Sequence, residues 1–256
     1  MSNINHLIIS NSFDFTTDYV CHELKERNEN YLRLNRDNFS TYKICYDLNI
    51  GNLIVEFKSN TFHINEDNLK SIYFRAPAFL RNNRKVNSSY TEQLYRSQWS
   101  SFIRNLMIFE NITWVNKPSA TYKAENKMLQ LKYAKNIGFK IPKTKITNSK
   151  DFYLKDEDWF IVKSLDTAIL RKDNNEAFVY SNAIKKEEFL NSNIREAPLI
   201  LQEYISPKTD LRITVIGDKI YAVKIEKNGD GIDGDWRKEK DNVNFVPIQL
   251  PKEIKH

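Results

Sequence analysis

The chain has 256 residues, of which 39 are Lys or Arg and 33 are Asp or Glu, so its formal net charge is +6. Hydrophobic residues make up 41% of it and aromatic residues 12%; this is enough apolar surface to offset the chain entropy lost on folding, and it excludes an intrinsically disordered protein. Only 6 residues are glycine, against about 7% in an average chain, which excludes collagen-like and other glycine-repeat architectures. The length allows one large domain or two small ones, and we predict two.

No stretch of the sequence predicts secretion or membrane insertion. The apolar runs, such as residues 7–9, are far shorter than the roughly 18 residues that span a bilayer, and the polar N-terminus has no signal-peptide core. We therefore expect a cytoplasmic protein with no membrane partner. The cysteines, Cys21 and Cys45, lie in no CxxC pattern and near no pair of histidines, which predicts two reduced, buried thiols and neither a disulfide framework nor a zinc site.

The positive charge is spread along the chain rather than gathered in one patch. Its densest cluster consists of Arg81, Arg84 and Lys85, without interleaved aromatic residues. A nucleic-acid-binding surface needs a denser basic patch than this, so nucleic acid is the weakest candidate partner. The surplus charge also suits a nucleotide or an acidic peptide.

The N-terminal part predicts an α/β domain. An apolar strand is predicted at 7–10 and a helix at 16–27, and this order of elements is typical of α/β folds. Further short strands are predicted at 31–34, 42–48, 53–57 and 71–74. Residues 49–52 are predicted to form the hairpin turn between the strands 42–48 and 53–57. Ser89 and Glu92 form a capping-box pattern ahead of a long helix, whose apolar residues recur at helical spacing as far as Phe109.

The change from the first domain to the second is predicted soon after this helix. Residues 114–116 predict a short extended piece, and 117–119 (Lys-Pro-Ser) predict a turn with Ser119 as the N-cap of a new helix. We place the domain boundary here, which gives domains 1–116 and 117–256. The new helix is predicted from residue 120 to about 137, because Gly138 and the proline soon after it are typical of a helix end.

Beyond this helix short strands dominate, which predicts an α+β domain with mostly antiparallel pairing. The predicted strands are 143–146, 159–162, 168–170, 177–180, 199–204, 211–216 and 220–225, with a short helix near 186–190. Gly217 and Asp218 join the last two strands as a two-residue hairpin turn. Alternation puts Arg212 on the face opposite Leu211 and Ile213, so Arg212 is predicted to point away from an apolar side.

The segment 229–234 reads Gly-Asp-Gly-Ile-Asp-Gly and formally matches the GxGxxG fingerprint of dinucleotide-binding proteins. A helix should follow such a loop, but 235–237 predict an extended stretch, and Asp230 and Asp233 would repel a pyrophosphate. A calcium loop is excluded as well, because Ile232 and the absence of a Glu at the last position break the ligand spacing. We expect a flexible loop between two strands.

Short polar and basic segments of the second half follow the order found in one enzyme superfamily. These segments are 116–118, 127–134, 138–148, Lys163, 202–205, 210–217 and 235–237. In this order they resemble the ATP-grasp ligases. The pattern Ser-Ile-Tyr-Phe-Arg-Ala-Pro at 71–77 is similar to that of the microviridin-type (graspetide) peptide-crosslinking ligases and the grasp-with-spasm peptide maturases. The resemblance covers nearly the whole chain, and its specificity lies in the order of short pieces.

The resemblance implies an ATP-grasp-like fold with an N-terminal α/β pre-ATP-grasp domain and antiparallel sheets around a nucleotide cleft. The residues that it implies for ATP binding are Lys127, Lys163, Gln202, Glu203, Tyr204, Ile205 and Asp210. Adenine would lie against the strand end at 203–205, where backbone donors and acceptors are free, and Asp210 would accept hydrogen bonds from the ribose. The two lysines would neutralise the phosphates.

The implied reaction has two steps, for which Arg212 and Arg237 are the implied catalytic residues. ATP phosphorylates an Asp or Glu carboxylate of a precursor peptide that carries a leader, and a Ser, Thr or Lys side chain of the same peptide then displaces phosphate to form an ester or amide crosslink. Fixed guanidinium groups would stabilise the charge that develops on the transferred phosphoryl group. No protein nucleophile is needed. A second copy of the chain, forming a homodimer, is a further candidate partner.

Two positions depart from the superfamily pattern. Residues 164–167 (Ser-Leu-Asp-Thr) stand where many ATP-grasp enzymes have a glycine-rich phosphate loop. Mg²⁺, the second implied cofactor, is held in the family by a Glu-x-Asn element, and no such element follows Arg237. The sequence therefore predicts that this chain carries no metal ligands. We expect a chain that is truncated, is completed by a second chain, or no longer catalyses.

Other functions stay open at this point. A catalytically impaired ATP-grasp-like protein would bind a leader peptide or another partner without chemistry, and an ATP-grasp ligase could instead act on a small amino acid. A basic nucleic-acid-binding protein is the third alternative. ATP hydrolysis stimulated by a precursor peptide would distinguish the peptide ligase from the catalytically impaired binding protein. A steep salt dependence of oligonucleotide binding would identify a nucleic-acid-binding protein.

Overall fold

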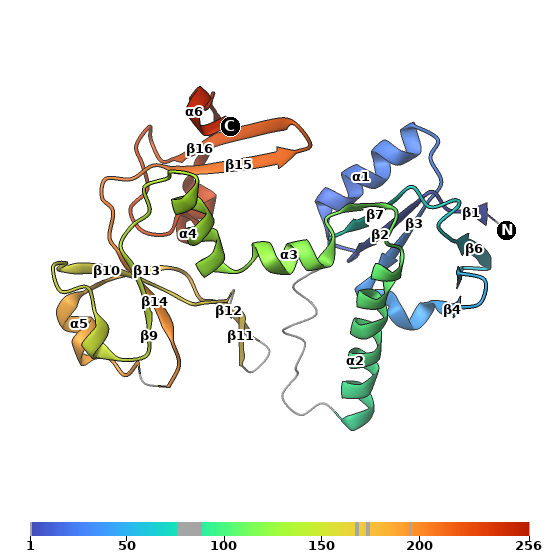
Figure 1. Ribbon diagram of the computed structural model, residues 1–256, viewed down its shortest axis with the longest axis horizontal. Helices are drawn as coiled ribbons and strands as arrows, with labels where there is room; N and C mark the ends of the chain where they lie inside the picture. The colour runs from blue at the N-terminus through green and yellow to red at the C-terminus, as the bar shows by residue number, and fades with distance from the viewer. Residues whose placement is uncertain (1, 76–88, 167–168, 173–174, 195, 256) are drawn as a thin grey trace. The chain divides into compact units, whose positions relative to one another are not determined.

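The computed structural model describes residues 2–75, 89–166, 169–172, 175–194 and 196–255. The chain divides into two compact units, Met1–Asn126 and Lys127–His256, which are drawn in Figure 1. Helix α3, which the sequence predicts in the second domain, lies in the first unit. Several residues used in the sequence predictions lie outside the described residues: 76–77 of the N-terminal pattern, the basic cluster at 81–85, and residues 167 and 168.

The first unit contains a parallel sheet of four strands in the order β3-β2-β7-β8. The strands are β2 (His6–Ser10), β3 (Tyr31–Asn35), β7 (Ser71–Phe74) and β8 (Thr113–Val115). Helix α1 (Phe15–Glu26) connects β2 to β3, and Asp14 caps it by accepting a hydrogen bond from the Thr17 amide. The chain winds outward from β2 in one direction and from β7 in the other, so this part is the predicted α/β arrangement.

A second sheet of the first unit has the order β1-β6-β5-β4. Its strands are β1 (Ser2–Asn3), β4 (Lys43–Asp47), β5 (Asn52–Phe57) and β6 (Asn60–Ile64). The predicted hairpin between β4 and β5 is confirmed, with Gly51 at a φ of +64°. Strand β6 was not predicted, because the turn before it is made by Lys58 and Ser59 at positive φ and carries no glycine signal.

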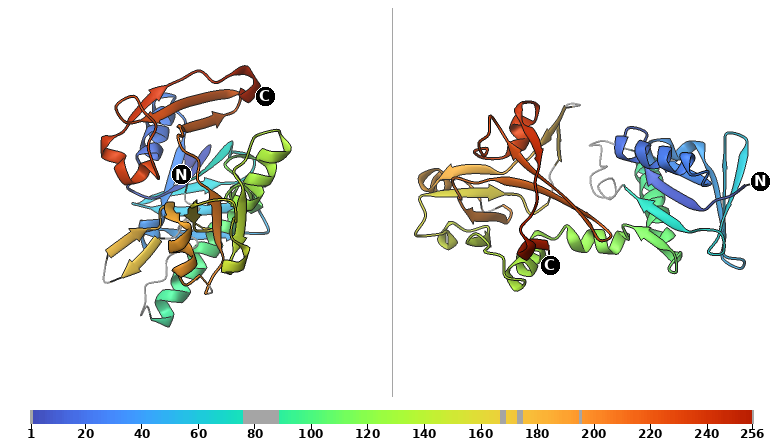
Figure 2. Two further views of the ribbon diagram at one scale, coloured as in Figure 1. Left: turned by 90° about the vertical axis from the view of Figure 1, so that its left-hand side faces the viewer. Right: turned by 90° about the horizontal axis from the view of Figure 1, so that it is seen from above.

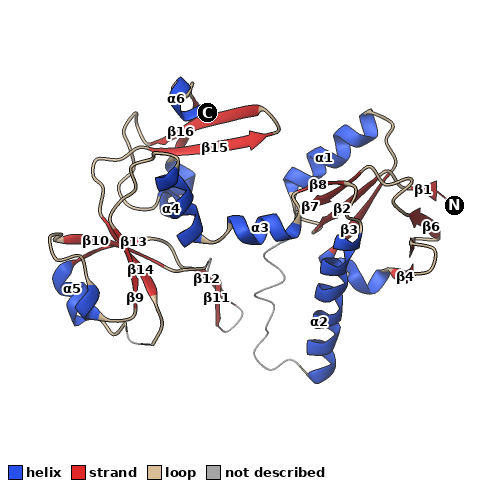
Figure 3. Cartoon of the chain, in the orientation of Figure 1, coloured by secondary structure: helices blue, strands red, loops and turns tan. Residues whose placement is uncertain are grey.

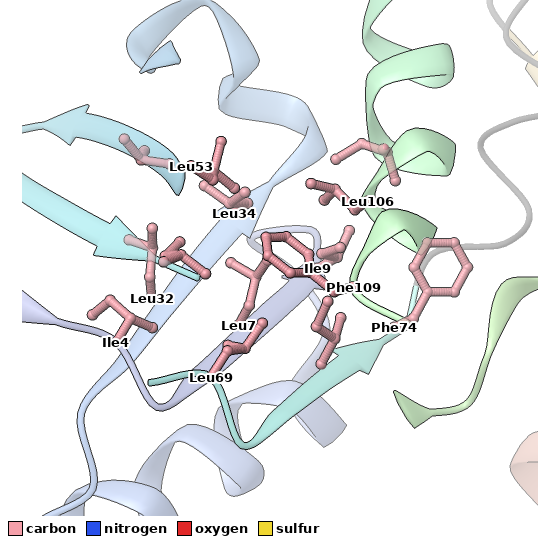
Figure 4. Close-up of a cluster of buried hydrophobic side chains, with 14 of the residues drawn as sticks. Ile4, Leu7, Ile9, Leu32, Leu34, Leu53, Leu69, Phe74, Leu106 and Phe109 are labelled. Carbon is pink, nitrogen blue, oxygen red and sulfur yellow. The ribbon is translucent and has the colours of Figure 1, made fainter. Parts of the chain in front are cut away.

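The core of the first unit is a cluster of buried side chains from both sheets and one helix, shown in Figure 4. The helix is α2 (Tyr90–Asn105), continued by the 3₁₀ turn η3 (Leu106–Ile108), and a further 3₁₀ turn, η1 (Arg36–Thr41), follows β3. The Ser89 hydroxyl caps α2 as predicted, whereas the Glu92 carboxylate binds Arg96. Phe39 stacks on Trp99 at 4.6 Å.

One cysteine prediction is wrong. Cys21, a residue of α1, is buried, but Cys45 is exposed. Its neighbours on β4, Ile44 and Tyr46, pack against the core cluster, and alternation along the strand therefore turns Cys45 to the other side.

The helix predicted over 120–137 is two helices, α3 (Pro118–Ala124) and α4 (Lys127–Asn136). Asn126, a residue type that favours helix N-termini, lies at the break. Pro118 is the first helical residue and Lys117 the cap position, so the prediction of a Ser119 cap is wrong. The predicted end of α4 is confirmed: Gly138 has a φ of +93°, and the amides of Gly138 and Phe139 bind the carbonyls of Lys135 and Ala134, as in a Schellman motif.

The second unit contains an antiparallel sheet in the order β13-β10-β14-β9. Its strands are β9 (Thr144–Thr147), β10 (Trp159–Lys163), β13 (Asn182–Lys185) and β14 (Leu199–Glu203). The 3₁₀ turn η4 (Lys150–Phe152) follows β9, and helix α5 (Lys186–Asn191) follows β13. One face of this sheet packs on a small core that includes Phe160, Phe189 and Leu201.

A second antiparallel sheet of this unit has the order β15-β16-β17, and Figures 2 and 3 show it with the hairpin β11-β12. The elements are β11 (Ile169–Lys172), β12 (Asn175–Phe178), β15 (Asp210–Ile216), β16 (Lys219–Glu226), the 3₁₀ turn η5 (Trp236–Asn242), β17 (Asn244–Pro247) and α6 (Lys252–Lys255). The turn at Gly217 is confirmed, but the expected apolar side is not covered: Leu211 and Ile213 are exposed. None of the described helices is long and apolar enough to cross a membrane.

The core of the first unit gives a stability prediction. Phe109 is 1% exposed and Phe13 is 85% exposed. Phe109→Ala should lower the free energy of unfolding by about 3–5 kcal/mol, because it leaves a cavity in the cluster of Figure 4, whereas Phe13→Ala should change it by less than about 0.5 kcal/mol. Urea denaturation followed by circular dichroism measures both. Equal effects of the two substitutions would contradict this assignment of the core.

Candidate functional site

The two faces of the sheet β13-β10-β14-β9 differ in chemistry because side chains alternate along each strand. Phe160 lies opposite Glu203 and Ile161 lies opposite Gln202 in the antiparallel pairing of β10 and β14. Since Phe160 points into the core, Ile161, Gln202 and Lys163 belong to the opposite face. This second face also carries Ile146, Ile161 and Ile200, and we call its cluster of Thr144, Lys163 and Gln202 the polar face.

Lys163 is held on the polar face by a neutral partner. Its Nζ donates a hydrogen bond of 2.7 Å to Oε1 of Gln202, which is only 6% exposed. Burial lowers the pKa of Lys163, and the charge of Lys127 lowers it further, whereas Asp235 and Asp210 oppose the shift. The site therefore keeps a partly desolvated cation beside a second one.

Lys127 is the first residue of α4 rather than a mid-helix residue, which corrects its predicted position. Its Nζ donates a hydrogen bond of 2.6 Å to the carbonyl oxygen of Ser164, directly after β10. Burial lowers the pKa of Lys127, and Asp166 opposes this shift. The backbone contact thus brings Lys127 to the end of the strand that carries Lys163.

Sequence reasoning missed Lys208. Its ammonium forms an ion pair with the carboxylate of Asp210 at the start of β15, and the charges of both residues act on Lys163. Lys208 lies in a loop two residues before Asp210, and only this spacing could have indicated the pair. The structure therefore adds a third lysine to the predicted cluster.

Arg237 is held by Asp235, which sequence reasoning named as part of a motif but gave no role. The Asp235 side chain is 7% exposed and accepts hydrogen bonds from the Arg237 amide at 3.1 Å and from the Arg237 guanidinium at 3.2 Å. It also accepts one from the amide of Ser181 at 3.3 Å. Burial raises the pKa of Asp235, but these hydrogen bonds and the charge of Arg237 outweigh it and leave the pKa lowered. The Arg237 guanidinium also lies 4.9 Å above the ring of Trp236.

The segment predicted as a flexible loop is packed onto the rest of the site. Ile232 is buried, and an added Cβ at Gly231 would overlap the carbonyl oxygen of Lys208. The hydroxyl of Tyr204 donates a hydrogen bond to Asp233, and this bond raises the pKa of Tyr204. Only a residue without a side chain fits at 231, so the glycine there serves a close backbone approach rather than mobility.

The strand end 203–205 is exposed in part. Glu203 points away from the polar face, and its carboxylate accepts a hydrogen bond of 3.0 Å from the Lys143 amide. The Tyr204 ring lies 6.1 Å from that of Trp159, and Ile205 is exposed. Arg212 lies on the same face of β15 as Asp210 and is exposed, and within the described part of the chain it forms no ion pair.

The structure thus brings together Lys127, Lys163, Gln202 and Asp210 from the predicted set, joined by Lys208 and Asp235. Arg237 is tied to this group through Asp235. Among the described residues, no side-chain hydrogen bond or ion pair ties Arg212, Glu203 or Ile205 to it. Among the described residues, no group of three or more His, Cys, Asp or Glu side chains is placed to hold a metal ion.

Comparison with known proteins identifies the fold. No family model and no curated protein matches the sequence. The structure is similar to that of a RiPP-associated ATP-grasp ligase from Chryseobacterium gregarium in complex with ADP and a leader and core peptide, with a TM-score of 0.80, 24% identity, and coverage of 100% of this chain and 79% of that one. This chain has an ATP-grasp-like fold.

Two further structures agree with this ATP-grasp assignment. The macrocyclase MdnC from Microcystis aeruginosa MRC, bound with precursor peptide MdnA, has a TM-score of 0.80 at 19% identity, over 98% of this chain and 80% of that one. The ATP-grasp ligase PsnB, complexed with a minimal precursor, has a TM-score of 0.74 at 15% identity, over 98% of this chain and 79% of that one. The predicted resemblance to ATP-grasp peptide maturases is confirmed as a likeness of fold.

The contacts of Asp235 give a local prediction. Asp235→Ala should speed hydrogen exchange at the amides of Arg237 and Ser181 by about five- to tenfold, because a lost side-chain cap costs about 1 kcal/mol and 1.4 kcal/mol corresponds to a factor of ten. Hydrogen–deuterium exchange with mass spectrometry measures this. Asp218→Ala, in the exposed hairpin turn, is the matched control. Unchanged exchange in the Asp235 variant would show that its carboxylate does not hold these amides.

Proposed function

We propose that this chain is an ATP-dependent ligase that joins a side-chain carboxylate of a precursor peptide to a hydroxyl or amine of the same peptide. The ATP-grasp-like fold supports the use of ATP, and the similar structures were solved with ADP, with a leader and core peptide, or with a precursor. The peptide substrate comes from this likeness. The cationic cluster of the second unit supports the nucleotide independently.

The observation that carries the proposal is the way in which the two predicted phosphate-binding lysines are held. Lys163 donates to an amide oxygen and Lys127 to a backbone carbonyl, and neither forms an ion pair with a carboxylate in the part of the chain that the structure describes. Both ammonium groups are partly desolvated. Such charges stabilise the folded protein poorly by themselves and interact strongly with a polyanion.

The proposed roles follow from these positions. Lys127 and Lys163 bind the phosphates, and Asp210, turned by Lys208, accepts hydrogen bonds from the ribose. The backbone at the strand end 203–205, where the Glu203 amide is already bound to the Lys143 carbonyl, contacts the adenine edge. Arg237, held by Asp235, and Arg212 stabilise the negative charge on the phosphoryl group while it is transferred.

The proposed reaction proceeds in two steps. A peptide carboxylate oxygen forms a bond to the γ-phosphorus while the bond to the bridging oxygen breaks, which releases ADP and leaves an acyl phosphate. A hydroxyl or amine of the peptide then attacks the acyl carbon, loses its proton and releases phosphate. Mg²⁺, as in the ligase PsnB complexed with precursor, Mg and ADP, would neutralise the phosphates; we assign it no ligands, because no acidic cluster for it is found among the described residues.

The lysines provide the first test. Lys127→Ala and Lys163→Ala should each weaken ATP binding by about ten- to a hundredfold, because each removes a charge-assisted contact of about 1.5–3 kcal/mol. Isothermal titration calorimetry with ATP measures the dissociation constants. Lys145→Ala is the matched control, because Lys145 lies on β9 on the other face and binds the carbonyl of Tyr153. ATP binding that is unaffected by both changes would contradict the proposal.

Arg212 separates catalysis from binding. Arg212→Ala should leave ATP binding within about threefold, but lower the rate of ATP consumption in the presence of a leader-bearing peptide by at least about a hundredfold, because the guanidinium acts mainly on charge that develops during transfer. The probe is a synthetic leader-bearing peptide rich in Asp, Glu, Ser, Thr and Lys, with phosphate release as the readout. Arg104→Ala, in the first unit, is the control. Equal rates for the Arg212 and Arg104 variants would remove Arg212 from the catalytic residues.

A further inference from the structure

The polar face contains a chain of hydrogen bonds that ends on Lys163. The Thr144 hydroxyl donates to the carbonyl oxygen of Pro142 at 2.8 Å. Nε2 of Gln202 donates to the oxygen of Thr144 at 2.9 Å. Lys163 then donates to Oε1 of Gln202 at 2.7 Å. The strand register produces this order, because Thr144 and Gln202 are direct partners in the pairing of β9 and β14.

The direction of each bond in this chain is fixed by chemistry. A lysine ammonium has three donors and no acceptor, so the side-chain amide must turn its oxygen toward it. The Pro142 carbonyl can only accept, so the Thr144 proton is used there and the Thr144 oxygen is left to accept from Nε2 of Gln202. Each of the three bonds pairs a donor with an acceptor in this arrangement only, so the amide of Gln202 has no equivalent alternative orientation.

We propose that Thr144 and Gln202 are positioning residues for Lys163: they fix its ammonium group with a neutral acceptor, so that no carboxylate at this position offsets the positive charge that binds the phosphates of ATP. This inference rests on the proposed function. It assigns Gln202 an action through Lys163 rather than on the nucleotide itself, and it adds Thr144, which sequence reasoning did not single out. A carboxylate of the same size at 202 would hold the ammonium equally well, but it would neutralise that charge and repel the triphosphate.

Substitution of Thr144 tests whether its hydroxyl positions Lys163 through Gln202. In Thr144→Val the hydroxyl is lost and Nε2 of Gln202 is left buried without a partner, so the Gln202 side chain is no longer held in place and Lys163 loses its fixed acceptor. ATP binding should weaken by about tenfold, whereas binding of adenosine, which has no phosphate, should change by less than about twofold. The ratio of the two dissociation constants, measured by calorimetry and competition, is the readout. Thr144→Ser keeps the hydroxyl and should restore the ratio.

The matched structural control is Thr147→Val on the same strand. Thr147 faces the opposite side and bonds the Ser149 backbone, so this variant suffers a similar loss of a hydrogen bond but should keep the wild-type ratio. Gln202→Glu gives the second arm, with ATP binding weakened by more than about tenfold and adenosine binding retained. The melting temperature of each variant is measured to check that it folds.

The outcomes separate this inference from the proposed function. If the unaltered chain binds no ATP, the proposed function fails and the inference with it. If it binds ATP, but Thr144→Val leaves ATP binding unchanged or weakens ATP and adenosine binding equally, only the inference is overturned. Wild-type affinity in Gln202→Glu would also overturn it, because a neutral acceptor would then make no difference to the lysine.

Discussion

The second unit is built around two lysine charges that are partly removed from water and that form no ion pair with any carboxylate of the described residues. A desolvated ammonium costs free energy unless hydrogen bonds compensate it. Here the compensation comes from neutral oxygens, the Gln202 amide for Lys163 and the Ser164 carbonyl for Lys127. A carboxylate would lower the energy of the empty protein more but would compete with an anionic ligand. Because the acceptors are neutral, part of the free-energy cost of desolvating the two ammonium groups remains, and a bound polyanion removes it.

The sheet supplies the geometry that this arrangement needs. Because β10 and β14 pair in a fixed antiparallel register, one face packs on the core around Phe160 while the other presents the lysine and its amide. A slip by one residue would put Lys163 into that core. The loop that follows β16 connects to the same group, since Gly231 packs on Lys208 and Asp235 holds Arg237. Packing on one face of the sheet and charge on the other are thus set by the same pairing.

Much of this structure could be predicted from local sequence signals. Alternation located most strands, Gly138 ended α4, and the order of short motifs indicated the ATP-grasp-like fold. Strands β1, β6, β13 and β17 and the break between α3 and α4 were not predicted from the sequence. Neither β6 nor the break is marked by glycine or proline. Lys208, Asp235 and Thr144 were missed as partners because their roles depend on contacts across strands and loops. Thr144 and Gln202 are 58 residues apart, and only the register joins them.

The most direct test is a crystal structure of this chain with a non-hydrolysable ATP analogue. We predict that the adenine contacts the backbone at 203–205 and that the phosphates lie within ion-pair distance of the ammonium groups of Lys127 and Lys163, with Lys163 still bound to the Gln202 amide. A nucleotide bound elsewhere on the chain, or phosphates that contact neither lysine, would contradict the assignment of this cluster as the ATP site.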